Sequence, residues 1–119
     1  GVAKSVSLVP IRVLNCRGSG ATSNVIYGIN WAISDHAAGT PAVANLSLGG
    51  SFSTSINTAI ANAVADGITV VVAAGNNNRL ACSYSPASAP SAITVGATTS
   101  ADARASYSNY GSFFEKIVK

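Results

Sequence analysis

Residues 67–76, Gly-Ile-Thr-Val-Val-Val-Ala-Ala-Gly-Asn, contain the stretch that decides the fold. The run 68–74 is apolar or β-branched throughout, which is typical of a strand buried on both faces inside a parallel sheet. Gly67 stands where a preceding helix would end, and Gly75 stands where the strand would turn into a loop. We therefore predict a central parallel strand over 68–74.

Helical and strand-like patterns alternate on both sides of this strand. One helix is predicted to start at Thr22 or Ser23 and to end near residues 39–41, and a second is predicted to start at a cap formed by Ser53 or Thr54. Alternation of this kind produces βαβ crossovers, so the predicted fold class is α/β with a parallel sheet. The other predicted strands cover 6–14, 42–48 and 92–97, and a long loop covers 75–90.

Function is expected at the carboxyl ends of these strands, because open α/β sheets bind their ligands there. The loops 15–20, 49–53 and 75–78 each follow a predicted strand. They should converge at one edge of the sheet.

The composition excludes several classes of protein. The chain has 119 residues, of which 48% are hydrophobic and 9% charged, so one folded domain is expected and disorder is not. The net charge of +3 is spread thinly without aromatic neighbours, which argues against nucleic-acid binding. No apolar run approaches the ~20 residues of a membrane span. Because methionine is absent, we expect Gly1 to follow processing, excision or an unseen upstream part.

Two local motifs suggest different chemistry when each is taken alone. Gly18-Ser19-Gly20 between a strand and a helix resembles a dinucleotide-binding turn, but no acidic residue ends a second strand about 20 residues later. Asn76 follows the buried strand directly, where a carboxamide could donate to a developing oxyanion. A loop asparagine that only satisfies backbone groups is the alternative interpretation of Asn76.

Six short motifs in one order and spacing decide between these interpretations. Together they resemble the subtilase family, and within it the proteinase K and aqualysin branch, over residues 1 to about 112. The motifs are 13–20 (VLNCRGSG), 45–50 (NLSLGG), 73–76 (AAGN), 84–87 (YSPA), 93–97 (ITVGA) and 107–111 (YSNYG).

The resemblance implies a function and a set of site residues. The chain would be the central segment, 1–119, of a secreted serine endopeptidase domain that acts on extended peptide or protein substrates. Asn76 would belong to the oxyanion hole. The implied substrate-binding residues are Arg17, Gly18 and Ser19 on one edge, Ser47, Leu48 and Gly49 on the other, and Ala73, Ala74 and Gly75 at the wall of the pocket for the substrate side chain.

The resemblance also implies that the catalytic triad is absent from this chain. The family order is Asp, His, Ser, and the first two motifs would precede Gly1 while the nucleophile would follow Lys119. The one histidine, His36, matches no such motif, and we expect it to be solvated at a helix end. The chain alone is therefore predicted to be inactive, and the rest of the protease domain is an expected partner. The alternative is a non-catalytic remnant or a peptide-binding module.

Cysteines and calcium are the last features that the resemblance addresses. From the residues alone, Cys16 and Cys82 could form a disulfide, stay free or pair elsewhere. The family scheme pairs each with a different missing cysteine, so they are not expected to pair with each other. No cofactor is expected for the chemistry. A structural calcium could use the carbonyls of Pro90 and Ala92 and the carboxylate of Glu115, although residues 113–119 depart from the family pattern.

Overall fold

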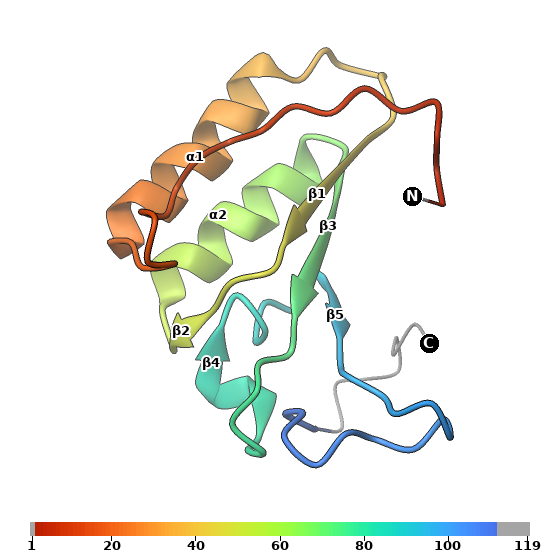
Figure 1. Cartoon of the computed structure of the whole chain (residues 1–119). Helices are drawn as coiled ribbons and strands as arrows, with labels where there is room; N and C mark the ends of the chain where they lie inside the picture. The colour runs from red at the N-terminus through yellow and green to blue at the C-terminus, as the bar shows by residue number, and fades with distance from the viewer. Residues whose placement is uncertain (1, 112–119) are drawn as a thin grey trace.

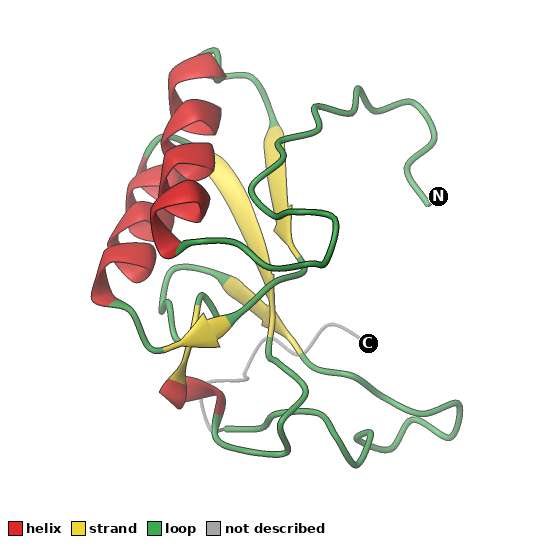
Figure 2. Cartoon of the chain, turned by 60° about the vertical axis from the view of Figure 1, so that its left-hand side comes forward, coloured by secondary structure: helices red, strands yellow, loops and turns green. Residues whose placement is uncertain are grey.

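A computed structural model describes residues 2–111 of the chain. Within these residues, two α-helices pack against one face of a three-stranded parallel sheet (Figures 1 and 2). The helices are α1 (Thr22–Asp35) and α2 (Thr54–Ala65), and the sheet consists of β1 (Ala42–Leu46), β3 (Ile68–Ala73) and β5 (Ile93–Val95). Two short strands, β2 (Gly50–Ser51) and β4 (Tyr84–Ser85), pair separately, and a 3₁₀ helix, η1 (Ala81–Ser83), precedes β4. The predicted α/β class is confirmed.

The sheet has the order β1-β3-β5, and its strands run parallel in close register. Leu46 at the end of β1 lies opposite Val72, and Val95 at the end of β5 lies opposite Ala73. The three strands therefore end at the same edge, and β3 lies in the centre as predicted. The chain segments that follow them start from neighbouring points.

The core lies between the sheet and the helices. On β3, the side chains of Ile68, Val70 and Val72 are at most 4% exposed, and they face the apolar stripe of α2. Ile60 of α2 is completely buried. The two helices also pack against each other, and α1 contributes Val25 and Ile29 to this core.

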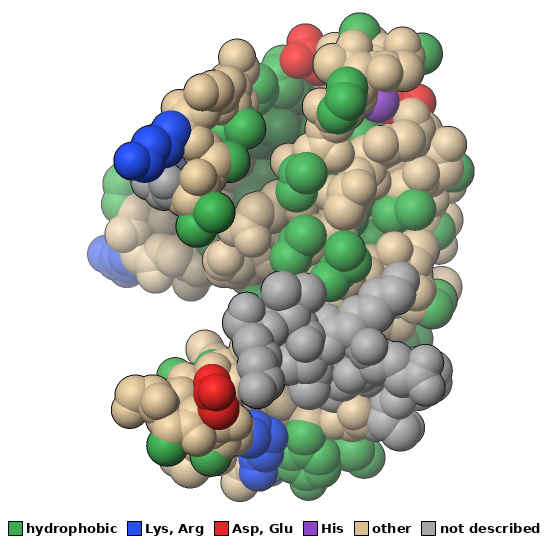
Figure 3. Space-filling view, turned by 90° about the vertical axis from the view of Figure 1, so that its right-hand side faces the viewer, with side chains coloured by type: hydrophobic (Ala, Val, Ile, Leu, Met, Phe, Trp, Pro, Cys, Tyr) green, Lys and Arg blue, Asp and Glu red, His purple; other side chains and the backbone are tan. Residues whose placement is uncertain are grey.

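Among residues 2–111, helices cover only one face of the sheet, so the prediction that the central strand is buried on both faces was wrong. Thr69 is exposed, Val71 is half-buried, and Val43 on β1 is 70% exposed. A parallel sheet is buried on both faces only when elements cover both, and both described helices lie on the same side. Hydrophobic side chains are scattered across the view of the molecule in Figure 3.

The predicted strand over 6–14 was also wrong. Within residues 2–111 this segment is extended but pairs with no strand, and Val6, Leu8 and Val9 are more than half exposed. It runs along α1, where a side chain at Gly28 would collide with Val13. β-branched residues favour extended backbone, but a strand also needs a neighbouring backbone to pair with.

The helix ends follow the prediction for α2 and differ from it for α1. Ser53 caps α2 by accepting a hydrogen bond from the N–H of Ile56 at 3.3 Å, and Gly67 follows the helix with φ of +103°. The residue that caps α1 is Ala21, which has no side-chain acceptor, and the helix ends at Asp35 before the predicted 39–41. No helix within residues 2–111 is both long and apolar enough to cross a membrane.

Candidate functional site

The carboxyl edge of the sheet brings two of the three predicted loops together. Ser47 follows the end of β1 directly, and Ala74 follows the end of β3, which is the neighbouring strand. The backbone N–H of Ala74 still bonds to the carbonyl of Val95 on β5, at 2.8 Å. The sequence-based prediction that the segments after these strands lie side by side agrees with this register.

The loop after β3 turns sharply and exposes Asn76. Gly75 has φ of +99°, a backbone conformation that residues with a side chain rarely adopt. Asn76 comes next and is exposed, whereas Ala74 is only 1% exposed. Asn76 is therefore not buried against backbone, and an exposed carboxamide at this edge is available as a hydrogen-bond donor.

A residue that the sequence reasoning did not single out holds this loop. Asn109 is 2% exposed, and its amide group bonds to backbone on both sides of Asn76. Its Nδ2 donates to the carbonyl of Ala74 at 2.8 Å, while its Oδ1 accepts from the N–H of Asn77 at 2.9 Å and of Arg79 at 3.1 Å. Its membership of the motif 107–111 was the one signal in the sequence.

The rest of the segment 104–110 runs beside the same loop. The backbone N–H of Asn78 bonds to the carbonyl of Tyr107 at 2.8 Å, and the N–H of Tyr110 bonds to the carbonyl of Arg79 at 3.0 Å. Arg104 donates to the side chain of Asn78 at 3.0 Å and stacks over the ring of Tyr110. The loop that bears Asn76 is thus fixed along its length.

The segment after β1, residues 47–53, is held by the core and by β4. Leu48 packs against the core, whereas Ser47 and Gly49 are exposed. Gly50 pairs with Ser85 through β2 and β4, and the buried hydroxyl of Ser85 accepts a hydrogen bond from the backbone N–H of Ser53 at 2.9 Å. The motif 84–87 therefore supports the segment that contains Ser47 and Gly49.

The third predicted loop, before α1, is built around one asparagine. The side chain of Asn15 accepts hydrogen bonds from the backbone N–H groups of Arg17 at 2.9 Å and Ser19 at 3.1 Å, and Gly18 has φ of +74°. Arg17, Gly18 and Ser19 are all exposed. Figures 1 and 2 place this loop at the same end of the sheet as the segment after β1.

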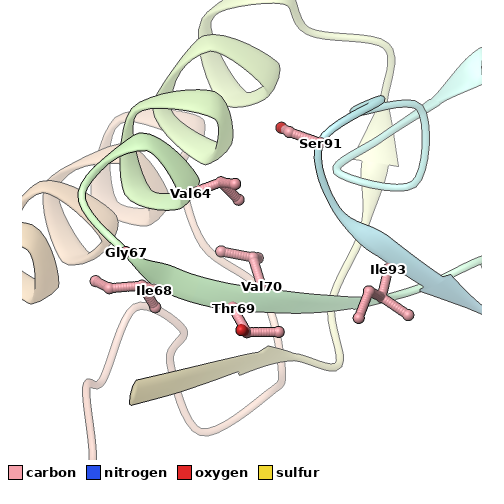
Figure 4. A pocket seen from close by; sticks show the side chains of 7 residues that line it. All are labelled: Val64, Gly67, Ile68, Thr69, Val70, Ser91 and Ile93. Carbon is pink, nitrogen blue, oxygen red and sulfur yellow. The ribbon is translucent and has the colours of Figure 1, made fainter. Parts of the chain in front are cut away.

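A pocket of about 250 Å³ lies elsewhere, around the start of β3 (Figure 4). Its lining is mostly aliphatic and includes the hydroxyl of Ser91, which is buried without a hydrogen-bond partner. None of the predicted site residues within 2–111 lines it. The lining residues are Val64, Gly67, Ile68, Thr69, Val70, Ser91 and Ile93.

His36 is not the solvated residue that the sequence predicted. Its side chain is only 6% exposed, its Nδ1 lies 2.7 Å from Oδ2 of Asp66, and its Nε2 lies 2.8 Å from the carbonyl of Thr40. The Thr40 carbonyl and then Asp66 raise the pKa of His36 above its ordinary value of 6.5. Both ring nitrogens are occupied, so His36 connects the end of α1 to the end of α2.

Two of the three predicted calcium ligands lie within the described residues. Pro90 is exposed and Ala92 is buried, and both lie in the turn before β5, but Glu115 lies outside the described residues. Within 2–111, no three His, Cys, Asp or Glu side chains are grouped to hold a metal. Cys16 and Cys82 are both free and exposed.

Comparison with known proteins identifies the family. The model of the subtilase family (Peptidase S8) matches residues 1–118. The chain is 61% identical over 111 residues to the extracellular serine proteinase of Thermus sp. (strain Rt41A), covering 93% of this chain and 27% of that protein. It is 54% identical over 112 residues to the alkaline serine exoprotease A of Vibrio alginolyticus, covering 94% and 21%.

The fold agrees with this sequence similarity. The crystal structure of a cold adapted subtilisin-like serine proteinase superimposes with a TM-score of 0.90 at 50% identity, covering 95% of this chain and 41% of that one. The chain spans less than half the length of each of these relatives. Family match, sequence identity and fold agree, and the chain belongs to the subtilase family of serine proteases.

Proposed function

We propose that this chain is the segment of a secreted serine endopeptidase that binds extended substrate and stabilises the oxyanion of the acyl-transfer step. The observation that carries this proposal is the position of Asn76, exposed at the carboxyl edge of the sheet on a loop that Asn109 holds on both sides. Ser47 and Gly49 start from the neighbouring strand end. Secretion is supported by the names of the relatives, an extracellular proteinase and an exoprotease.

The chemistry of Asn76 would be electrostatic. When a nucleophile attacks the scissile carbonyl, the carbonyl oxygen becomes negative, and the side-chain N–H₂ of Asn76 would donate to it. A donor held in place before the reaction needs no reorganisation in the transition state. A neutral amide also avoids the desolvation of a permanent charge. In subtilisin, a member of this family, loss of the oxyanion-hole asparagine lowers kcat by about 10²–10³-fold, and this magnitude is taken from that enzyme.

Substrate would bind as an additional strand. Exposed backbone of Ser47–Gly49 would pair with a peptide on one side, and Arg17–Ser19 would flank it on the other. Ala73 and Gly75 would contribute to the wall of the side-chain pocket. Ala74 is 1% exposed, so its contribution would be structural support beneath that wall.

Nucleophile and general base would come from outside these 119 residues. His36 is engaged by Asp66 and Thr40, so it has no free nitrogen for a serine within the described structure. We therefore expect the isolated chain to remain unlabelled by a fluorophosphonate probe. If the probe labels the chain and substitution of one serine abolishes the labelling, the prediction that the triad is missing is wrong. A peptide-binding module, by contrast, would bind peptide without being labelled.

The Asn76 assignment is tested in a host that supplies the triad. The Thermus proteinase, with this chain in place of the segment that it matches, is compared with its Asn76→Ala variant. We expect kcat to fall about 10²–10³-fold with KM nearly unchanged, because the interaction forms mainly in the transition state. Asn77→Ala is the matched control, since it removes an exposed neighbouring carboxamide and leaves the backbone N–H intact. Equal kcat values for both variants would refute the assignment.

A structural calcium at the carbonyls of Pro90 and Ala92 with Glu115 is a further part of the proposal. The ion would stabilise the fold, since oxygen ligands of this kind suit calcium. Glu115→Gln should remove the rise in melting temperature that added calcium produces, and a rise that persists would exclude Glu115 as a ligand.

A further inference from the structure

Asn109 is the one buried polar side chain, among residues 2–111, that bonds to the backbone on both sides of Asn76. It reaches the loop from a segment more than 30 residues later in the chain. Its Nδ2 bonds to the carbonyl of Ala74, and its own backbone N–H bonds to the carbonyl of Gly75 at 2.9 Å. Its Oδ1 bonds to the N–H groups of Asn77 and Arg79.

Between Ala74 and Asn77, these contacts leave out one residue, which is Asn76 itself. The residues immediately before and after it are fixed, while its own side chain is exposed. We call these bonds of Asn109 to Ala74, Gly75, Asn77 and Arg79 the clamp. The clamp restricts where the carboxamide of Asn76 can point, because only the torsions of Asn76 itself stay free. Without the side chain of Asn109, the bonds from Tyr107, Tyr110 and Arg104 still hold the loop, but only at Asn78 and Arg79. The turn at Gly75 would then lose support, because glycine is conformationally permissive.

The clamp is also close-packed. A side-chain Cβ at Gly75 would lie 2.5 Å from Nδ2 of Asn109, so the glycine is required for this approach. Behind it, the hydroxyl of Ser108 donates to the carbonyl of Asn109 at 3.0 Å and accepts from the N–H of Ala97 at 2.9 Å. Asn109 is therefore tied to the segment after β5, and this rigid support is what a preorganised donor requires.

We propose that Asn109 is the positioning residue for the oxyanion donor Asn76, a role that rests on the proposed function. It does not touch substrate. It acts by holding Ala74, Gly75, Asn77 and Arg79 so that the Asn76 amide is aimed before the reaction begins.

The experiment uses the Thermus chimera described above and a double-mutant cycle. Asn109→Ala should lower kcat about 10- to 100-fold with little change in KM, because displacement of a catalytic group by about 1 Å has effects of this size. In the Asn76→Ala background, the same substitution should lower kcat by less than about threefold, since there is no donor left to position. Thr94→Val is the control: it removes a buried hydroxyl that donates to the carbonyl of Ala87, and kcat should stay unchanged.

Hydrogen exchange gives a readout that does not depend on the reaction. Without the Oδ1 acceptor, the amides of Asn77 and Arg79 should exchange about tenfold faster. Asn109→Asp keeps that acceptor but places a carboxyl oxygen against the carbonyl of Ala74, so these two amides should stay protected while kcat stays lowered. In the Asn76→Ala background this loss of kcat should again be small. This variant also decides the matter if Asn109→Ala does not fold.

The outcomes separate the two proposals. If Asn76→Ala lowers kcat but the two losses multiply in the double mutant, Asn109 is only structural and the positioning role is overturned. Unchanged exchange at Asn77 and Arg79 also overturns it. If Asn76→Ala leaves kcat unchanged, the oxyanion function fails, and the positioning role fails with it.

Discussion

Gly75→Ala should lower the free energy of unfolding by more than the positive φ of this position alone would cause. A residue with a side chain at φ of +99° costs about 1–2 kcal/mol. The new Cβ would also stand 2.5 Å from Nδ2 and 3.3 Å from Cγ of Asn109, which is 2% exposed and has no space to retreat. Displacing that amide breaks its bond to the Ala74 carbonyl, for about 1–3 kcal/mol more. We expect a total loss of about 2–5 kcal/mol.

Gly39→Ala is the matched control. Gly39 has a similar φ of +82°, but a Cβ added there would have no atom within 4 Å, so only the backbone effect of about 1–2 kcal/mol applies. Equilibrium unfolding in urea, followed by the fluorescence of the single tryptophan, Trp31, gives both free energies. If the free energies of unfolding of the two variants fall by the same amount within about 0.5 kcal/mol, Asn109 moves aside without cost. That result would refute the rigidity of the contact between Asn109 and the loop.

Three other predictions concern regions away from this loop. Ser53→Ala should lower the free energy of unfolding by about 0.5–2 kcal/mol in urea titrations, because α2 loses its cap; an unchanged midpoint would contradict this. His36 has a raised pKa, so its contribution to stability is fully present below pH 6.5 and is lost as the pH rises through the raised value. Urea unfolding from pH 6.5 upward should show this decline, and Asp66→Asn should make it smaller, because the Thr40 carbonyl remains. Cys16 and Cys82 should both react with iodoacetamide in the folded chain without reductant. A Cys16–Cys82 linked peptide in a non-reducing digest would show instead that the two cysteines form a disulfide.

The parts of the fold that were predictable are those determined by local pattern. The central strand, the cap at Ser53 and the turn at Gly67 depend on residues within a few positions of each other, and the structure has all three. The segment 6–14 has equally strong local signals and still forms no strand in the described chain. Strand formation depends on a partner backbone, which local sequence does not specify.

Side-chain partners distant in sequence explain the errors in the candidate site. His36 was expected in solvent because it stands at the end of a predicted helix, whereas its partner Asp66 is 30 residues away. The burial of His36 follows from the packing of α1 beside α2, which periodicity alone does not define. The segment 75–90 was predicted to be one long loop, yet it contains η1 and β4. β4 forms because β2, more than 30 residues earlier in the chain, lies close enough to pair with it.

Asn76 and Asn109 illustrate the same distinction at the site itself. The sequence singles out Asn76 through the six motifs taken together, since a glycine and a carboxamide after a strand also fit a loop asparagine that only satisfies backbone groups. What Asn109 does cannot be found in that way, because an asparagine between Ser108 and Tyr110 could equally face solvent. Its contacts are visible only once the fold brings residue 109 against residues 74–79, where one buried amide satisfies three backbone groups. Asn76 and Asn109 are therefore distant in sequence and are brought together by the hydrogen bonds of Asn109 to the loop. If both proposals hold, a substitution at either residue should affect the same step of the reaction.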